Sequence, residues 1–295
     1  MINAPNVQEW LSLVSWLYFG LAAICAAIAW KIATRRRSKI IAAAVVVGLF
    51  LSWPIADVVS RVREQSAFKA RYDAAAARFA ERCKEAGEKI IRTVDDVDGI
   101  FVLKMRTTKD LGNGHEQYAP GAAFYRESSE EWYLKSFLWS EERIEGKRGR
   151  LYDRRTNPDF PGYSYVDFVE PAENKRYRYR LAEMHDPHSS NSNVRRVVER
   201  ELAPGPAPRY GVTFVDLIDP EDRKNWIAGS TVKIVDLQTS EEIATHTRFA
   251  FDRGLGASDG GRQAWAYASF CPALGPLYAA QTRHFVDQVL KPKGR

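Results

Sequence analysis

Cysteine is scarce in this chain, with three residues among 295, and their spacing excludes several kinds of site. No Cys-x-x-Cys pair occurs, so the usual dithiol redox motif is absent. No cysteine stands at the spacing from a histidine that zinc sites use. We therefore predict no metal site and no bound cofactor.

Phosphate-binding signatures are also missing. The glycine-rich segment 254–262 lacks the Gly-Lys-Ser/Thr ending of a P-loop and the strand-and-helix setting of a dinucleotide fingerprint. Its glycines are expected to permit turns with positive φ after a hairpin. Because loops often carry function, a binding role is left open. The polar groups of that site would be Asp252, Arg253, Asp259 and Arg262.

Charge is absent from one long stretch and nearly absent from a second. Residues 10–30 contain no charged side chain, and residues 40–59 contain only Asp57. A helix needs about 20 mostly apolar residues to cross the hydrocarbon core of a bilayer, and each run supplies that length. The nine residues 31–39 between them hold five lysines and arginines. We predict a transmembrane hairpin over residues 1–60; two buried helices of a soluble enzyme are the alternative.

The basic loop also predicts the orientation, because lysine and arginine near span ends favour the cytoplasm. The tail 1–9 holds no basic residue. We expect loop 31–39 in the cytoplasm of a bacterium, and the N-terminus and large domain in the periplasm. A cleaved signal peptide is not expected, because the first run is long and no basic segment precedes it. Four basic residues after the second span favour the opposite orientation: Arg61, Arg63, Lys69 and Arg71.

The net charge of +6 does not indicate nucleic acid as a partner. The chain holds 43 lysines and arginines against 37 acids. Residues 1–60 supply five basic and two acidic side chains, which leaves 38 against 35 in the rest. About half of the excess therefore belongs to the membrane flank, and we expect no nucleic-acid binding.

Two of the three cysteines are candidates for a disulfide. Cys25 falls inside the first apolar run, whereas Cys83 and Cys271 are the pair left in the remainder. In an oxidising compartment outside the cytoplasm, such a pair predicts a bond. Two buried free thiols are the alternative.

A stalk helix is predicted over residues 61–92. Apolar residues from Phe68 to Ile90 recur at intervals of three and four, which places them on one face of a helix. Cys83 lies on this stripe, where it faces inward and can meet Cys271. A coiled coil between copies is an alternative, although the stripe is short for one.

Residues 93–295 predict an extracytoplasmic α+β domain with a mainly antiparallel sheet and a C-terminal helix. Strand-like segments arrive in pairs rather than alternating with long helices. Asp219-Pro220 begins a short helix, with an N-cap and a proline at the first helical position. Strands are expected at 100–106, 163–170, 176–181, 210–217, 230–237 and 242–251, a strand or short helix at 194–201, and the closing helix at 277–290.

Histidine is the remaining source of catalytic chemistry, and five occur. His185-Asp186-Pro187-His188 offers metal ligands, but it has no distant partner and is expected to be a solvated loop. His246 is expected on the sheet surface, opposite Phe249 and Phe251, and His284 on the last helix. We therefore predict no catalytic triad and assign no catalytic residue.

Aromatic residues outside the predicted spans can fill a core or anchor an interface. Core packing is expected for most of them. Trp226, beside a turn before Gly229, is the exception and joins the candidate binding residues.

The predicted function is binding of a protein partner by a membrane-anchored periplasmic domain without enzymatic activity. A component of an envelope complex fits, as does an immunity-type protein against a periplasmic toxin. An envelope hydrolase with a loop-built active site and a membrane sensor are the alternatives. The bilayer itself and a protein of the envelope are the expected partners.

Overall fold

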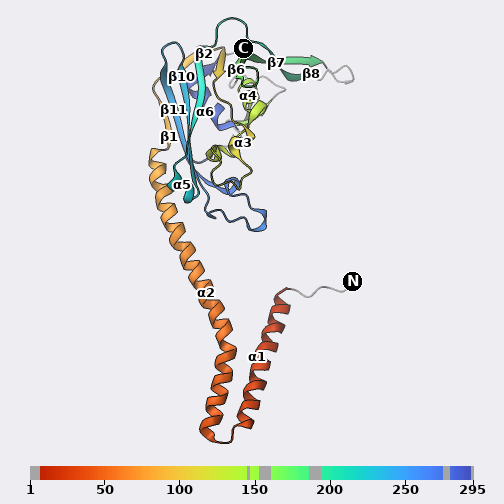
Figure 1. The fold of residues 1–295 in the computed structure, drawn as a ribbon. Coiled ribbons are helices and arrows are strands. Elements are labelled where there is room, and N and C mark those ends of the chain that lie inside the picture. Colours follow the sequence, from red (N-terminus) through yellow and green to blue (C-terminus); the bar gives the residue numbers. More distant parts are fainter. Residues whose placement is uncertain (1–6, 145–146, 153–160, 186–193, 275–279, 294–295) are drawn as a thin grey trace. The chain divides into compact units, whose positions relative to one another are not determined.

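The computed structural model describes residues 7–144, 147–152, 161–185, 194–274 and 280–293 (Figure 1). The chain forms two compact units, Met1–Arg71 and Tyr72–Arg295. Long helices occupy the first unit, and a large, mostly antiparallel sheet with shorter helices occupies the second. The predicted mixture of helix and antiparallel sheet is therefore confirmed.

Two long helices begin the chain. Helix α1 spans Val7–Ile32 and α2 spans Arg36–Glu85. Each contains an 18-residue window apolar enough to cross a membrane, and no residue of either window is buried. Because both helices extend beyond the predicted spans, the connection between them shortens from the expected 31–39 to residues 33–35.

Tyr18 of α1 supplies a hydrogen bond that α2 lacks because of Pro54. Proline has no N–H, so the carbonyl of Phe50, four residues earlier, loses its helical donor. The Tyr18 hydroxyl donates to that carbonyl, and its ring lies edge-on against the Phe50 ring at 5.5 Å between centroids. The hydrogen bond gives this backbone acceptor a donor in place of the one that proline lacks.

The second unit is built on a nine-stranded sheet. Eight strands follow the order β1-β11-β10-β9-β3-β6-β7-β8, and β12 pairs with β11. All pairs are antiparallel except those of β3, which runs parallel to both β6 and β9. The strands are β1 Gly87–Ile90, β3 Gly99–Val102, β6 Tyr165–Glu170, β7 Lys175–His185, β8 Val194–Leu202, β9 Tyr210–Leu217, β10 Ile227–Asp236, β11 Glu241–Phe251 and β12 Ser269–Cys271.

Shorter elements complete the second unit. Parallel neighbours need a long connection, and the one from β3 to β6 carries α3 Thr108–Leu111, the 3-10 turn η1 Ala122–Phe124 and α4 Glu130–Leu138. Two small sheets join β2 Val94–Val97 to β13 Leu290–Pro292, and β4 Ser140–Ile144 to β5 Lys147–Tyr152. The other helices are α5 Pro220–Lys224 and α6 Gln281–Val289, with 3-10 turns η2 Asp259–Gly261 and η3 Trp265–Tyr267.

Strand β11 is covered on both faces. Phe249 and Phe251 pack with Ala75 of α2. His246 points to the other face, where its ring lies 5.3 Å from that of Phe285 in α6, and only 4% of the residue is exposed. The expectation that His246 lies on the sheet surface is therefore wrong. The alternation along β11 was recognised, but alternation alone does not reveal that a helix covers the second face.

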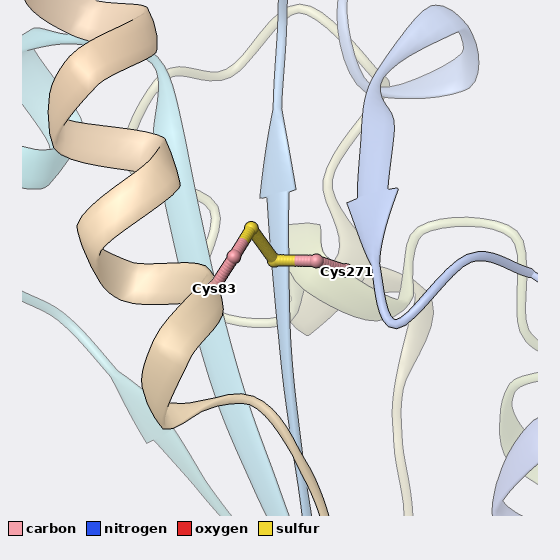
Figure 2. Close-up of a disulfide and its surroundings, with 2 residues drawn as sticks. All are labelled: Cys83 and Cys271. Atoms are coloured by element: carbon pink, nitrogen blue, oxygen red, sulfur yellow. A yellow bond between two sulfur atoms is a disulfide. The ribbon is translucent and has the colours of Figure 1, made fainter.

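A disulfide joins Cys83, in the last turn of α2, to Cys271 of β12 (Figure 2). Their Cα atoms lie 5.6 Å apart, and 188 residues separate them in sequence. The predicted pairing is confirmed. Two ion pairs hold the same end of α2, because Arg78 and Arg82 both contact Asp222 of α5.

The predicted stalk helix ends earlier than expected. Helix α2 stops at Glu85, and residues 87–90, which the stalk of 61–92 had included, form strand β1 against β11. Gly87 explains the change, because its φ of +123° is a conformation that helices do not contain and that other residues rarely adopt. The predicted stalk and the predicted second span also form one continuous helix, α2, rather than two elements.

Asp236, at the end of β10, is buried between two arginines. Arg209 Nη2 donates to its carboxylate at 2.8 Å, and Arg92 Nη2 donates at 2.5 Å. The hydrogen bonds from Arg209 hold the pKa of Asp236 well below its ordinary value of 3.8. A depressed pKa in the folded state means that the stabilisation is complete above the unfolded-state pKa and is lost as pH falls below it.

We therefore expect the full chain in detergent to lose stability as pH falls below about 4. In thermal melts at a series of pH values, Asp236→Asn should melt below wild type at neutral pH, and the difference should shrink in acid. Asp95→Asn is the matched control, because that carboxylate is exposed and pairs with Lys291. A difference for Asp236→Asn that stays constant across pH would contradict the assignment.

Candidate functional site

Three loops gather at one end of the central strands. β9 ends, β10 begins and β11 ends at this edge, because Gly229 pairs with Leu217 and Ile227 pairs with Phe251. The loops 218–226 and 252–268 therefore leave the sheet together. Gln117, in the connection after β3, donates to the carbonyl of Arg223 and ties that segment to them. We name this region, residues 112–121, 218–226 and 252–268, the loop end.

Asp252 and Arg262, two of the predicted binding residues, contact each other. The Arg262 guanidinium forms an ion pair with the buried Asp252 carboxylate, which also accepts hydrogen bonds from Gly254 N at 3.1 Å and Gly256 N at 2.8 Å. Arg262 Nη1 also donates to Ala257 O at 3.1 Å. Both side chains are used inside the loop, so their contribution is to fix its shape.

Trp226 packs inside the loop end rather than standing free. Its ring lies 5.5 Å from the buried Trp265 ring. A Cβ at Gly256 would approach the Trp226 ring to 2.1 Å, and Gly256 has a φ of +86°. Only glycine fits there. Trp265 N and Nε1 in turn donate to Gly114 O and Glu116 O, which joins the third segment to the cluster.

Several side chains of the loop end reach solvent. Arg253 and Asp259, the other two predicted binding residues, are exposed. So are Tyr118, Ile218 and Tyr267, with exposed fractions of 55%, 52% and 67%. The loop end therefore presents aromatic, aliphatic and charged groups on a backbone that is tied internally.

The same loop carries a further sequence motif. Gly256, Ser258 and Gly260 have the Gly-x-Ser-x-Gly spacing of a nucleophile elbow, in which a strained serine joins a strand to a helix. Here Ser258 has an ordinary φ of −113° and precedes the short 3-10 turn η2. The motif lacks the structural setting that the elbow requires, and the expectation of no catalytic residue stays a prediction.

A second candidate site is a cavity beside α6, which we name the α6 cavity. Its volume is about 350 Å³, within the range of small-molecule sites. β1, β11 and α6 supply most of its wall, and the segment after β12 closes it. The lining residues are Glu88, His246, Arg248, Pro272, Ala273, Gln281, His284, Phe285 and Gln288.

Polar side chains in the α6 cavity form a short chain of contacts. Arg248 Nη2 donates to Gln281 Oε1 at 3.1 Å and lies 3.4 Å from His246 Nε2. Because a guanidinium has no acceptor, His246 receives at Nε2 and carries its proton on Nδ1. That Nδ1 lies 3.4 Å from Glu88 Oε1. Interaction with His246 lowers the pKa of Glu88, which therefore stays ionised at neutral pH.

A buried charge network continues inward from the cavity. Arg106 Nη1 donates to Asp216 Oδ1 at 3.1 Å, and its Nε lies 3.7 Å from Glu127 Oε2. Glu127 also accepts from the backbone N of Thr282 at 2.6 Å and thereby occupies the N-terminus of α6. Burial raises the pKa of Glu127. Arg106 thus contacts both acids of this inner network, and the charge of Glu127 also acts on Arg248 through space.

No protein-family model, curated protein or solved structure matches the chain. Function is therefore inferred from the two sites themselves. Within the described residues, no group of three His, Cys, Asp or Glu side chains could hold a metal ion. The segment His185–His188 lies outside the described residues apart from the backbone of His185, which ends β7.

A third hollow, of about 320 Å³, lies near Tyr179 and Arg200. Its charges are already matched, because Arg200 Nη1 lies 3.6 Å from Glu170 Oε1. The α6 cavity differs, because no carboxylate of the described residues forms an ion pair with its arginine, Arg248.

The α6 cavity was not predicted from the sequence, because Glu88 was placed in the stalk helix and His246 on the sheet surface. The sequence did contain one signal of the cavity: Arg248 stands in a predicted strand whose alternate side chains face the interior of the domain.

Proposed function

We propose that this chain is a membrane-anchored, extracytoplasmic domain that binds a protein of the bacterial envelope. In this proposal α1 and α2 cross the inner membrane, the basic turn between them lies in the cytoplasm, and the unit Tyr72–Arg295 lies in the periplasm. The observation that carries the location is the disulfide between Cys83 and Cys271. Such bonds persist in oxidising compartments and are rare in the cytosol.

The loop end is the surface that we assign to the partner. Aromatic side chains provide much of the binding energy of protein interfaces, and Tyr118 and Tyr267 are both more than half exposed there. The ion pair of Asp252 with Arg262 and the packing of Trp226 against Trp265 hold the loops in one shape. A pre-shaped surface loses less conformational entropy when it binds. A component of an envelope complex and an immunity-type protein against a periplasmic toxin both fit this arrangement.

Thiol labelling of intact cells tests the location. A bulky, membrane-impermeant maleimide is applied to cells that produce the full chain with Cys25→Ser, with and without prior reduction. Labelling only after reduction is expected, because the disulfide blocks both thiols and the domain is outside. Labelling that requires lysis and no reductant would place the domain in the cytoplasm and overturn the proposal.

Site-specific crosslinking in the native host tests the binding surface. A photoreactive phenylalanine analogue replaces Tyr267 of the loop end or, as the matched control, the exposed Thr239 in the turn between β10 and β11. That turn lies at the opposite end of the same strands. A discrete crosslinked protein is expected from position 267 and not from 239. Equal products from both positions, or none from 267, would contradict the assignment.

A membrane sensor is the second candidate, and one observation favours it. Helix α2 ends at Glu85, and Glu88 of the following strand lines the α6 cavity. A ligand that moved β1 would therefore act three residues from the end of the helix that contains the proposed second span. Occupancy of the cavity is the first requirement of this function.

A further inference from the structure

The α6 cavity contains a buried cation, Arg248, on which the carboxylates of Glu127 and Glu88 act through space and not through an ion pair in the described part of the chain. Arg248 is 2% exposed, and within the described residues its hydrogen bonds go to the neutral amide of Gln281 and to His246. No carboxylate of those residues forms an ion pair with it, whereas Arg106 contacts both Asp216 and Glu127. Buried charges in proteins are normally paired. Burial lowers the pKa of Arg248 to about 10, so the guanidinium is charged at neutral pH.

Unused hydrogen-bond donors lie around the same point. Arg248 Nε and Gln281 Nε2 are buried, and neither has a hydrogen-bond partner among the residues that the structure describes. Both side chains line the cavity and are more than nine-tenths buried. A buried donor without a partner costs free energy that a bound acceptor would recover. Two neighbouring N–H donors, one of them cationic, match the two oxygens of a carboxylate.

The rest of the cavity wall indicates which group the ligand carries besides its carboxylate. Phe285, Pro272 and Ala273 supply an apolar side, and a volume of about 350 Å³ admits a group of ring size. The N-terminus of α6, which would otherwise attract an anion, is occupied by Glu127. We propose that the α6 cavity binds a small organic carboxylate, with the carboxylate on Arg248 and Gln281 and an apolar ring against Phe285.

Glu88 sets the selectivity of the site. Its carboxylate lies at the cavity wall and is directed to His246, with its side chain 35% exposed. One negative charge at the wall weakens the attraction for any anion, so a ligand must gain additional affinity from its apolar part. Inorganic phosphate, which has no apolar part, should therefore bind poorly. The inference stands apart from the proposed protein partner and can be tested on the purified chain.

The test measures fluorine NMR line broadening of two probes with the full chain in detergent micelles. 4-Fluorobenzoate carries the carboxylate, and 4-fluorobenzamide is its neutral counterpart of nearly the same shape. Micelles without protein give the baseline for partition into detergent. We expect fluorobenzoate to bind about tenfold more tightly than fluorobenzamide, because only the carboxylate forms charge-assisted hydrogen bonds. Competition by phosphate should be at least tenfold weaker than competition by unlabelled benzoate.

Two variants assign the binding to this cavity. Gln281→Glu places a carboxylate 3.1 Å from Arg248, in the position of the present amide oxygen, and should abolish binding of fluorobenzoate. Glu88→Gln removes the negative charge from the wall and should tighten it about tenfold. The second variant changes a partly exposed side chain and keeps the test decisive if Gln281→Glu folds poorly.

Three results would overturn the inference. The first is equal binding of the two probes, the second is binding that neither variant changes, and the third is phosphate competing as well as benzoate. The last would show a site that recognises charge alone. Failure of the crosslinking experiment at the loop end would leave these results unaffected, so the two proposals fail separately.

Discussion

Replacing Cys83 and Cys271 together by serine should lower the thermal midpoint of the full chain by roughly 10–20 °C. The bond closes a loop of 188 residues, and the chain-entropy relation gives about 5 kcal/mol for a loop of that length. For a unit of this size each kcal/mol corresponds to about 2–4 °C. The loss is expected to be concentrated at the end of α2, where the bond joins this helix to the sheet through β12.

The third cysteine supplies the control for this experiment. Cys25→Ser changes a partly exposed residue of α1 and leaves the disulfide intact, so its midpoint should stay close to that of wild type. Tryptophan fluorescence of the protein in detergent gives both midpoints, with and without reductant. Reductant should lower the midpoint of wild type and leave the double variant unchanged. A double variant as stable as wild type would show that the ion pairs of Arg78 and Arg82 suffice to hold α2.

Arg283→Met should have the second largest effect, a loss of about 3–5 kcal/mol. Arg283 is fully buried in α6 and donates to the carbonyls of Ser136 and Trp139 at the end of α4, and to that of Pro161 at 3.1 Å. Its Nε also pairs with Asp287 Oδ2 at 3.0 Å. Methionine would remove the donor that these three carbonyls share and the guanidinium that lies 3.0 Å from the Asp287 carboxylate.

Urea unfolding of the full chain measures this loss. Arg180→Met is the matched control, because Arg180 is half exposed and its contact with Glu201 is 3.9 Å long, so little change is expected. Arg283→Lys keeps the charge but replaces a planar group with five donors by one with three, and should fall between the two. Equal stability of Arg283→Met and Arg180→Met would rule out the proposed role.

Local patterns in the sequence predicted the parts of the fold that depend on neighbouring residues. The hairpin of β10 and β11 follows from alternation on both sides of a short turn. Helix α5 follows from Asp219, whose carboxylate accepts from Glu221 N and Asp222 N as an N-cap. The disulfide followed from helical periodicity, which turned Cys83 inward, together with the small number of cysteines.

Long-range pairing was beyond the same reasoning. The parallel position of β3 depends on which strands it meets after a connection of about 60 residues, and no local pattern encodes that choice. Strand β1 was predicted as helix because Ile90 continues the apolar interval of the stalk, and only the backbone of Gly87 interrupts it.

The same distinction, between what local patterns predict and what only the fold determines, applies to the candidate sites. The glycine-rich loop was recognised, and the structure places Asp252, Arg262 and Trp226 together in the loop end. Their mutual contacts depend on the fold and could not be read from the chain. The α6 cavity brings together residues from 88 to 288, and its central feature is that no carboxylate of the described residues forms an ion pair with Arg248. Such a feature appears only in the folded structure, where residues distant in sequence become neighbours.

Pairing between the first and the last strands of the domain limits when its folding can be completed. Strand β1 needs β11, β2 needs β13, and Cys83 needs Cys271, so the earliest residues of the second unit pair with its latest. A ribosome adds about 5–20 residues per second, so roughly 10–30 s separate the synthesis of β1 from that of β11. Throughout that interval Cys83 is a thiol without its partner. Folding of this domain is therefore completed only after its last strands have been made.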